Sequence, residues 1–167
     1  MTIRGQMKLR CLKMTKRTRA DAHALLQKFL SEDEHYLDSS AAYGDKGPEL
    51  GPKALARAIT LFLRKPELGF VWLAYADGKA AGVCIVCYAV STSIGGVVAK
   101  LDDVFVADGY RGKGVGTKMI EALKAELKKK KVGRIDTAVH LRNPGAARYY
   151  ARLGFKSLGE ERLALVL

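Results

Sequence analysis

The chain of 167 residues is about the size of one domain, and its hydrophobic content of 49% is too high for a disordered protein. Its 29 Lys and Arg residues against 17 Asp and Glu give a net charge of +12, which favours an anionic partner such as nucleic acid, a membrane surface or a phosphorylated small molecule. The three cysteines are an odd number, which excludes a disulfide framework.

The first part of the chain predicts a strand followed by two helices. Residues 7–14 can form the strand, and Thr18 then caps a helix whose apolar residues recur at helical spacing up to Leu30. The acidic stretch 31–40 interrupts, and a second helix is predicted over 52–64. The basic N-terminus lacks the long apolar core of a signal peptide.

Residues 80–99 carry no charge and are as long as a bilayer span. A polar, glycine-containing break and many β-branched residues nevertheless favour a strand, a turn and a strand. Just before this stretch, Asp77-Gly78 predicts a hairpin turn between two strands within 69–90. We therefore expect a cytoplasmic protein without a membrane segment.

The cysteines and histidines give no sign of a metal or redox site. Cys84 and Cys87 have CxxC spacing, but they lie in an apolar strand, where residues three apart point to opposite faces. Buried apolar thiols are the default interpretation. His23, His35 and His140 are not spaced like metal ligands. No metal is predicted.

The second part predicts a β-helix-β unit, a short helix and a closing strand. These elements are a strand ending at 101–106, an amphipathic helix over about 114–130, a strand over 134–140, a helix over about 143–154 and a strand over 156–167. A β-helix-β unit of this size normally makes a right-handed crossover between parallel strands. No repeat or linker is evident, so one domain is expected over residues 7–167.

The loop between the first of these strands and the long helix is dense in glycine. Gly112, Gly114 and Gly116 recur at every second position, and Arg111 and Lys113 add positive charge. The first amides of a helix have no internal partner, and the helix dipole makes this end positive. Glycines remove the Cβ atoms that would keep phosphate oxygens away. The loop therefore predicts a pyrophosphate site at the carboxyl end of the strand.

Two common phosphate-binding loops do not match this stretch. A Walker loop would need glycine at 107 and Ser or Thr at 114, where the chain has Ala107 and Gly114. A Rossmann fingerprint would need glycine at 117, which is Thr117. The complete strand, loop and helix context favours another kind of phosphate site, with a merely flexible turn as the alternative.

Residues 111–116, RGKGVG, resemble the [QR]-x-x-G-x-[GA] signature of the GCN5-related N-acetyltransferases, the GNAT superfamily. Residues 143–155 resemble a second block of that family, N-x-x-A-x-x-x-Y-x-x-x-G-F. The residues that match this block are Asn143, Ala146, Tyr150, Gly154 and Phe155. The order of elements fits the family from about residue 7 to the end, with Pro144 and Gly145 as mild departures.

The resemblance implies an α/β (α+β) GNAT-like acyl-CoA N-acyltransferase fold. Its sheet is mixed and mostly antiparallel, with a splayed parallel strand pair and helices on both faces. It also implies acetyl-CoA as co-substrate and an N-acetyltransferase that acts by direct attack in a ternary complex. The cofactor-binding residues would be Val104, Phe105, Val106, Arg111, Gly112, Lys113, Gly114, Val115, Gly116, Thr117, Asn143 and Tyr150.

Acetyl transfer to an amine needs a base for the amine and an acid for the departing thiolate. Tyr150 matches the catalytic tyrosine of the family, and a phenol can donate its proton; a core tyrosine is the alternative. Asp102 and Asp103 are candidates for the base. Neighbours on a regular strand face opposite sides, so only one of them can face the site. The resemblance aligns a glutamate of several family members with Asp102, but Asp103 and a water stay open.

Other features leave alternatives open. Asn143 either binds the CoA arm or caps the helix that begins at Pro144. The acidic patch at 32–38 either recognises a cationic amine or is a surface loop. The expected acceptor is a primary amine of a small molecule, such as a polyamine, an amino acid or an aminoglycoside, with a protein N-terminus or lysine as the alternative.

Two rival functions are a nucleic-acid-binding module and a non-catalytic acyl-CoA sensor. The sequence shows no helix-turn-helix, RRM or zinc pattern, so nucleic acid is disfavoured as a partner. The presence of Tyr150 argues against a sensor. A homodimer is left open.

Overall fold

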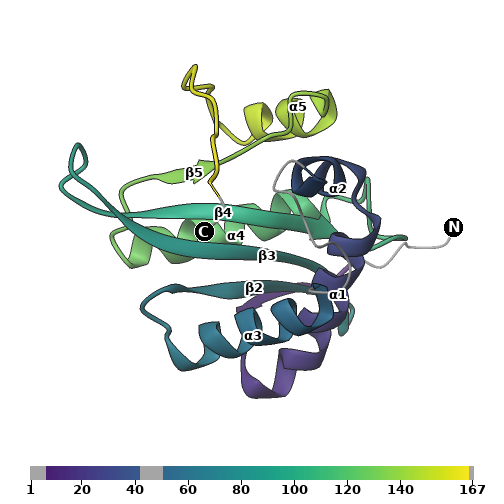
Figure 1. Cartoon of the computed structure of the whole chain (residues 1–167). Helices are drawn as coiled ribbons and strands as arrows, with labels where there is room; N and C mark the ends of the chain where they lie inside the picture. Colours follow the sequence, from purple (N-terminus) through teal and green to yellow (C-terminus); the bar gives the residue numbers. More distant parts are fainter. Residues whose placement is uncertain (1–6, 42–50, 166–167) are drawn as a thin grey trace, which may run out of the picture.

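The computed structural model describes residues 7–41 and 51–165. Its middle layer is a five-stranded sheet in the order β1-β2-β3-β4-β5 (Figure 1). The strands are β1 (Leu9–Lys13), β2 (Gly69–Ala76), β3 (Lys79–Ser91), β4 (Gly96–Val106) and β5 (Ile135–Thr137). The first four pair antiparallel, and β5 pairs parallel with β4. The predicted mixed sheet with one parallel pair is confirmed.

Helices cover both faces of this sheet, as predicted (Figure 1). The helical segments are η1 (Lys16–Thr18), α1 (Arg19–Glu32), α2 (Glu34–Ala41), α3 (Gly51–Arg64), α4 (Val115–Lys129) and α5 (Pro144–Arg152). Helix α4 packs on one face, together with residues of α5, and α1 and α3 pack on the other. The sheet is therefore buried on both sides.

Two apolar cores result, one on each face of the sheet. Trp72 of β2 belongs to the core under α4, whereas its neighbour Leu73 belongs to the core under α1 and α3. Because both faces are covered, β2 appears in the sequence as a continuous apolar run. Cys84 lies in the first core and Cys87 packs against the second, so their predicted opposite orientation is confirmed.

The uncharged stretch 80–99 forms most of β3, a turn and the start of β4, as predicted. Within the residues that the structure describes, no helix is both long and apolar enough to cross a bilayer.

A β-bulge interrupts strand β4 at Asp103. Asp103 and Val104 together lie opposite a single residue of β3, and Asp103 has a left-handed backbone with φ 50°. Leu101, before the bulge, joins the core under α4, whereas Phe105, after it, joins the core under α1 and α3. The extra residue therefore reverses the alternation for the part of β4 that follows it. That Asp102 and Asp103 face opposite sides stays a prediction.

The acidic stretch that was expected to interrupt the first two helices contains α2. The Oδ1 atom of Asp33 accepts a hydrogen bond from the backbone N–H of Tyr36 at 2.8 Å, which caps this helix. The sequence signal for it was an aspartate cap followed by Glu34 in the first turn. Thr18 is the N-cap residue of α1 as predicted, but its hydroxyl accepts from the N–H of Thr15 instead of a helix amide.

The predicted closing strand is wrong over 156–165, where the structure has no strand, and residues 166–167 lie outside the described part. The alternating leucines of this segment are left uncovered, with Leu163 and Leu165 each 85% exposed. The predicted partner strand over 134–140 is also shorter than expected, since β5 has three residues. Such a short edge offers few backbone groups for another strand.

Candidate active site

The glycine-rich loop leads from the end of β4 into α4. Gly112 (φ 70°) and Gly114 (φ 79°) have left-handed backbone conformations, which favour glycine. A Cβ atom added to either would meet no atom within 4 Å, so the space above the loop is open. The first i→i−4 bond of the helix runs from Lys118 N–H to the Gly114 carbonyl at 3.0 Å. The amides of Val115 and Gly116 precede it, and the loop therefore forms an open cradle at the positive end of α4.

Arg111 anchors this loop to β4. Its Nε donates to the Val106 carbonyl at 2.9 Å, and its guanidinium lies 5.3 Å from the centroid of the Phe105 ring. Its Nη1 is 3.4 Å from Asp108 Oδ1, while the other oxygen of Asp108 is 2.9 Å from Lys28 Nζ of α1. Because Asp108 offsets much of this positive charge, we assign most of the attraction for phosphate to the loop amides and the helix dipole.

A buried hydroxyl lies beside the first turn of α4. A Cβ atom on Gly116 would come within 3.2 Å of Tyr149 Oη and 3.3 Å of Val106 Cγ2. In the described residues, Tyr149 Oη is the buried side-chain oxygen that lacks a hydrogen-bond partner, and burial raises the pKa of this tyrosine. An unsatisfied buried donor is costly unless a ligand reaches it. The open cradle and this hydroxyl both fit a cofactor that carries a pyrophosphate.

Tyr150 lies on α5, 9% exposed, where strands β4 and β5 part. The parallel pairing of the two strands ends at Leu101 and Thr137, and the Thr137 hydroxyl donates to the Leu101 carbonyl at 2.9 Å. Burial raises the pKa of Tyr150 to about 12, against a smaller lowering by a hydrogen bond with Thr137. This phenol is therefore protonated at neutral pH, the state that can donate a proton.

The structure distinguishes the two adjacent carboxylates of β4. Asp102 Oδ2 lies 2.7 Å from Lys100 Nζ. Burial raises the pKa of Asp103 to about 6, and the negative charges of Asp102 and Asp33 add to this rise while Lys100 and Arg162 oppose it. A carboxyl group with such a pKa titrates closer to neutrality and is better suited to be a general base.

Asn143 caps helix α5. Its Oδ1 accepts a hydrogen bond from the Ala146 N–H at 2.9 Å, which is the contact that the helix-cap alternative predicted. This contact uses the acceptor of the amide and leaves its N–H donors for another partner.

Two histidines connect α2 with the segment that follows β5. The ring of His140 in this segment lies 5.2 Å from the ring of His35 in α2.

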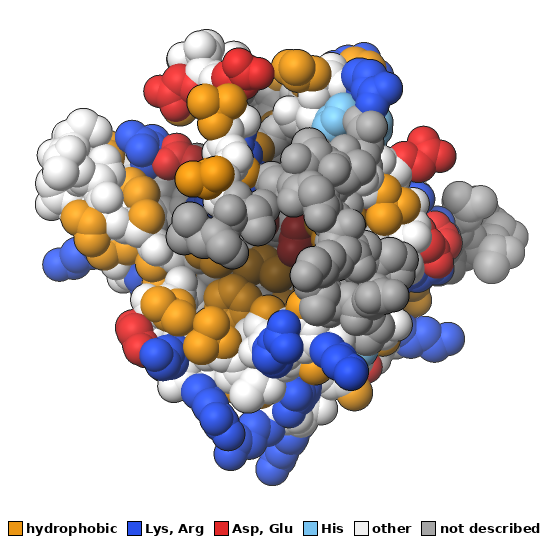
Figure 2. All heavy atoms as spheres, viewed as in Figure 1, with side chains coloured by type: hydrophobic (Ala, Val, Ile, Leu, Met, Phe, Trp, Pro, Cys, Tyr) orange, Lys and Arg blue, Asp and Glu red, His pale blue; other side chains and the backbone are white. Residues whose placement is uncertain are grey.

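A cavity of about 280 Å³ lies between the loop and the junction of α1 and α2. It is lined by Glu32, Asp33, Glu34, His35, Phe105, Asp108 and Arg111. Residues 32–34 of the predicted acidic patch therefore line the same cavity as Arg111, which anchors the glycine loop. The side chain of Asp38 lies outside the described residues. On the face covered by α1 and α3, Figure 2 shows a hollow over β3 and β4 with an apolar floor and an acidic side chain in it.

Sequence reasoning missed two residues of this site. Thr137 was predicted only as part of a strand, and Tyr149 only as part of a short helix. Neither carries a local signal, because each acquires its place from the packing of α5 over the end of the parallel pair.

The chain belongs to the acetyltransferase (GNAT) family, which its sequence matches over residues 22–155. Members of this family use acetyl-CoA as the acetyl donor. Over 95 residues the chain is 32% identical to an uncharacterised N-acetyltransferase of Methanocaldococcus jannaschii, a match that covers 56% of this chain and 42% of that protein. The chain thus spans less than half the length of this curated relative.

Solved structures agree on the fold. A possible acetyltransferase from Clostridium difficile 630 superposes with a TM-score of 0.78 at 16% identity, over 95% of this chain and 97% of the other. A predicted acetyltransferase from Clostridium acetobutylicum, solved with acetyl-CoA, gives a TM-score of 0.70 at 15% identity, over 95% and 96% of the two chains. At these identities the likeness concerns the fold alone. Membership of the family that the glycine loop predicted is confirmed.

Proposed function

We propose that this protein transfers the acetyl group of acetyl-CoA to the primary amine of a small cationic molecule, such as a polyamine, an amino acid or an aminoglycoside. The observation that carries the proposal is the arrangement around β4. The open glycine cradle follows the end of this strand, Asp103 lies in its bulge, and Tyr150 lies where β5 leaves it. The acetyl-CoA bound to the related fold from Clostridium acetobutylicum supports this choice of donor.

The donor would be held by backbone groups more than by side chains. The amides at the start of α4 and around Gly112 and Gly114 would bind the pyrophosphate. Strand β4 continues to Val106, five residues beyond its last pair with β5 at Leu101. Its edge along 104–106 therefore carries backbone groups that β5 does not use. Apart from the Val106 carbonyl, which accepts from Arg111, these would pair with the pantetheine arm. Bound acetyl-CoA supplies an acetyl group that is already activated as a thioester.

Two side chains would accept and donate the protons of the reaction. Asp103 accepts the proton that the amine loses as its nitrogen bonds to the acetyl carbon, directly or through a water. Tyr150 donates its proton to the sulfur as the carbon–sulfur bond breaks. Their pKa values, raised to about 6 and about 12, keep the first largely ionised and the second protonated at pH 7. The reaction needs no covalent enzyme intermediate.

The acceptor preference rests on charge. The cavity at the α1–α2 junction is lined by four carboxylates and one arginine, in a protein whose net charge is +12. Lys28 pairs with two of these carboxylates, Glu32 and Asp108, and the other two are Asp33 and Glu34. Local negative charge in a basic protein attracts a cationic amine and repels anionic molecules. Asp33, one of the four, acts electrostatically on Asp103, which ties this cavity to the proposed base.

The test is calorimetric titration with acetyl-CoA, followed by free-thiol release over a panel of amines. The panel contains spermidine, single amino acids, an aminoglycoside, a peptide with a free N-terminus and an N-blocked lysine peptide. We expect binding, and thiol release with a small polycationic amine. Release with a peptide alone would replace the small-molecule acceptor by a protein acceptor. Binding without release would support a sensor, and the absence of binding would overturn the proposal.

A further inference from the structure

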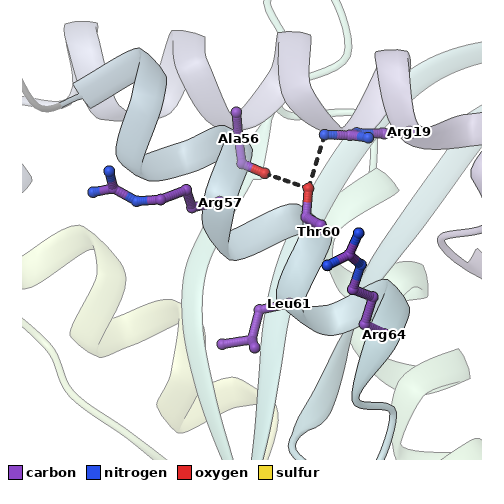
Figure 3. A pocket seen from close by; sticks show the side chains of 6 residues that line it. All are labelled: Arg19, Ala56, Arg57, Thr60, Leu61 and Arg64. Atoms are coloured by element: carbon purple, nitrogen blue, oxygen red, sulfur yellow. Dashed lines mark hydrogen bonds between the residues drawn. The ribbon is translucent and has the colours of Figure 1, made fainter.

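A cavity of about 370 Å³ lies between the start of α1 and the exposed side of α3 (Figure 3). Arg19, Arg57 and Arg64 line it, around Thr60. Arg19 Nη2 donates to Thr60 Oγ1 at 2.9 Å, and Thr60 in turn donates to the Ala56 carbonyl at 2.8 Å. Figure 3 shows the Arg64 side chain beside this contact and Arg57 pointing away from it. Arg19 is thus held in place with most of its five N–H donors unused by this bond.

These arginines form no ion pair in the described part of the chain. Helix α3 contains no Asp or Glu, and none of the ion pairs among residues 7–41 and 51–165 involves Arg19, Arg57 or Arg64. By contrast, Arg111 and Arg134 each pair with an aspartate. An exposed and uncompensated group of guanidinium ions attracts anions.

The positive charge extends along α3 as a stripe. Lys53, Arg57 and Arg64 are four and seven residues apart, so they lie on one side of the helix and span about 16 Å along its axis. Lys16 and Arg17 of η1 lead into α1 at the same region. Figure 2 shows Lys and Arg side chains gathered at the lower edge of the view, where Figure 1 places α1 and α3. A stripe with diverging side chains suits a linear polyanion better than one small ion.

We propose that this α1–α3 basic surface binds nucleic acid through its backbone phosphates, independently of base sequence. Guanidinium groups match phosphate oxygens in pairs, and such contacts supply the sequence-independent part of nucleic-acid affinity. They require none of the base-recognition motifs whose absence disfavoured a dedicated nucleic-acid module. The surface lies on the face of the sheet opposite α4, apart from the glycine cradle.

The test is fluorescence anisotropy of the purified chain with a labelled single-stranded RNA and a labelled DNA duplex, both of mixed sequence, over a series of salt concentrations. The variant is Arg57→Gln/Arg64→Gln. Its control is Lys128→Gln/Lys129→Gln, which removes the same charge at the end of α4. We expect a wild-type Kd on the order of 10⁻⁴–10⁻⁶ M at physiological salt. The arginine variant should bind about tenfold more weakly, and the salt slope of its log K should fall by about two.

The lysine control should lose less than about threefold in affinity and keep most of the salt slope. Both variants should bind acetyl-CoA as the wild type does, which shows that the fold and the glycine cradle are intact. Equal losses in the two variants would overturn the proposal, because the net charge would then explain the binding. No binding to either nucleic acid would also overturn it, as would binding to vesicles that contain anionic lipid in place of nucleic acid.

Discussion

The donor side and the acceptor side of the candidate site are built differently. Most of the proposed donor side comes from one contiguous stretch, in which the end of β4, the glycine loop and the start of α4 follow each other within 104–117. The acceptor side combines the α1–α2 junction, the bulge at Asp103 and the segment after β5. A contiguous site depends on local backbone conformation, whereas a dispersed one depends on packing. Substitutions on the two sides should therefore affect different steps.

The largest effect is expected for Tyr150→Phe, where the two sides meet. Loss of the phenol proton should lower turnover by about 10²–10⁴-fold, the usual contribution of a general acid, while acetyl-CoA affinity stays nearly unchanged. Steady-state kinetics and calorimetry separate the two quantities. The matched control is Tyr149→Phe, which removes the neighbouring hydroxyl beside the glycine cradle and should affect acetyl-CoA affinity more than turnover. If turnover of the Tyr150 variant equals that of the wild type, the assignment of the acid is wrong.

The next effect is expected on the acceptor side, for Asp103→Asn. Turnover at pH 7 should fall about 10- to 100-fold, because water can take over part of the role of the base. In the wild type, kcat/KM should fall as the pH drops below about 6, where the carboxyl of Asp103 becomes protonated. This inflection should be absent from the variant.

Asp102→Asn is the control for this substitution, since it breaks the contact with Lys100 but leaves the bulge residue in place. It should keep the inflection and most of the turnover. A loss of the inflection in the Asp102 variant alone would move the role of base from Asp103 to Asp102.

A smaller effect is expected on the donor side, for Gly114→Val. A left-handed backbone costs an L-residue about 1–2 kcal/mol, and the new side chain would also fill the open cradle. Acetyl-CoA affinity should fall about tenfold in calorimetry, with turnover of the saturated enzyme much less affected. Gly109 has the same backbone class (φ 82°) and open surroundings outside the signature. Gly109→Val should reproduce the strain without the loss of affinity.

The contrast between the two sides also explains what the sequence could predict. The hairpin at Asp77-Gly78 and the glycine loop follow from local conformations that few residues can adopt, and both were predicted from single short stretches. The bulge could not be, because no neighbouring glycine marks Asp103 as the site of a turn, as Gly78 marks Asp77. Its conformation is imposed by the pairing of β4 with β3, which no short stretch of sequence contains.

The same limit applies to the elements at the edge of the fold. The pattern of alternating leucines after residue 160 is that of a strand, but a strand also needs a partner edge, and β5 offers three residues. At Asp33 the sequence did contain the signal. Aspartate is a common helix cap, but the run of acidic residues around it favoured the prediction of a loop in place of α2. Tyr150 was predicted as the catalytic acid from the resemblance to the family, whereas its contact with Thr137 is seen only in the structure.

The smallest expected effect is on stability, and it opposes the effect on rate. The pKa of Asp103 is about 6 in the folded protein and about 4 in an unfolded chain, so the folded state binds more protons between these values. Stability should therefore fall as the pH rises from about 4 to about 6, and the ionised carboxylate should keep it lower at pH 7. Asp103→Asn removes this cost and should raise the melting temperature at pH 7 by a few degrees, with the fall between pH 4 and 6 flattened. Thermal unfolding over this pH range measures both.

A variant that is slower yet more stable than the wild type would show that the buried charge of Asp103 aids catalysis and lowers stability. A less stable variant would mean that the carboxylate has a structural partner.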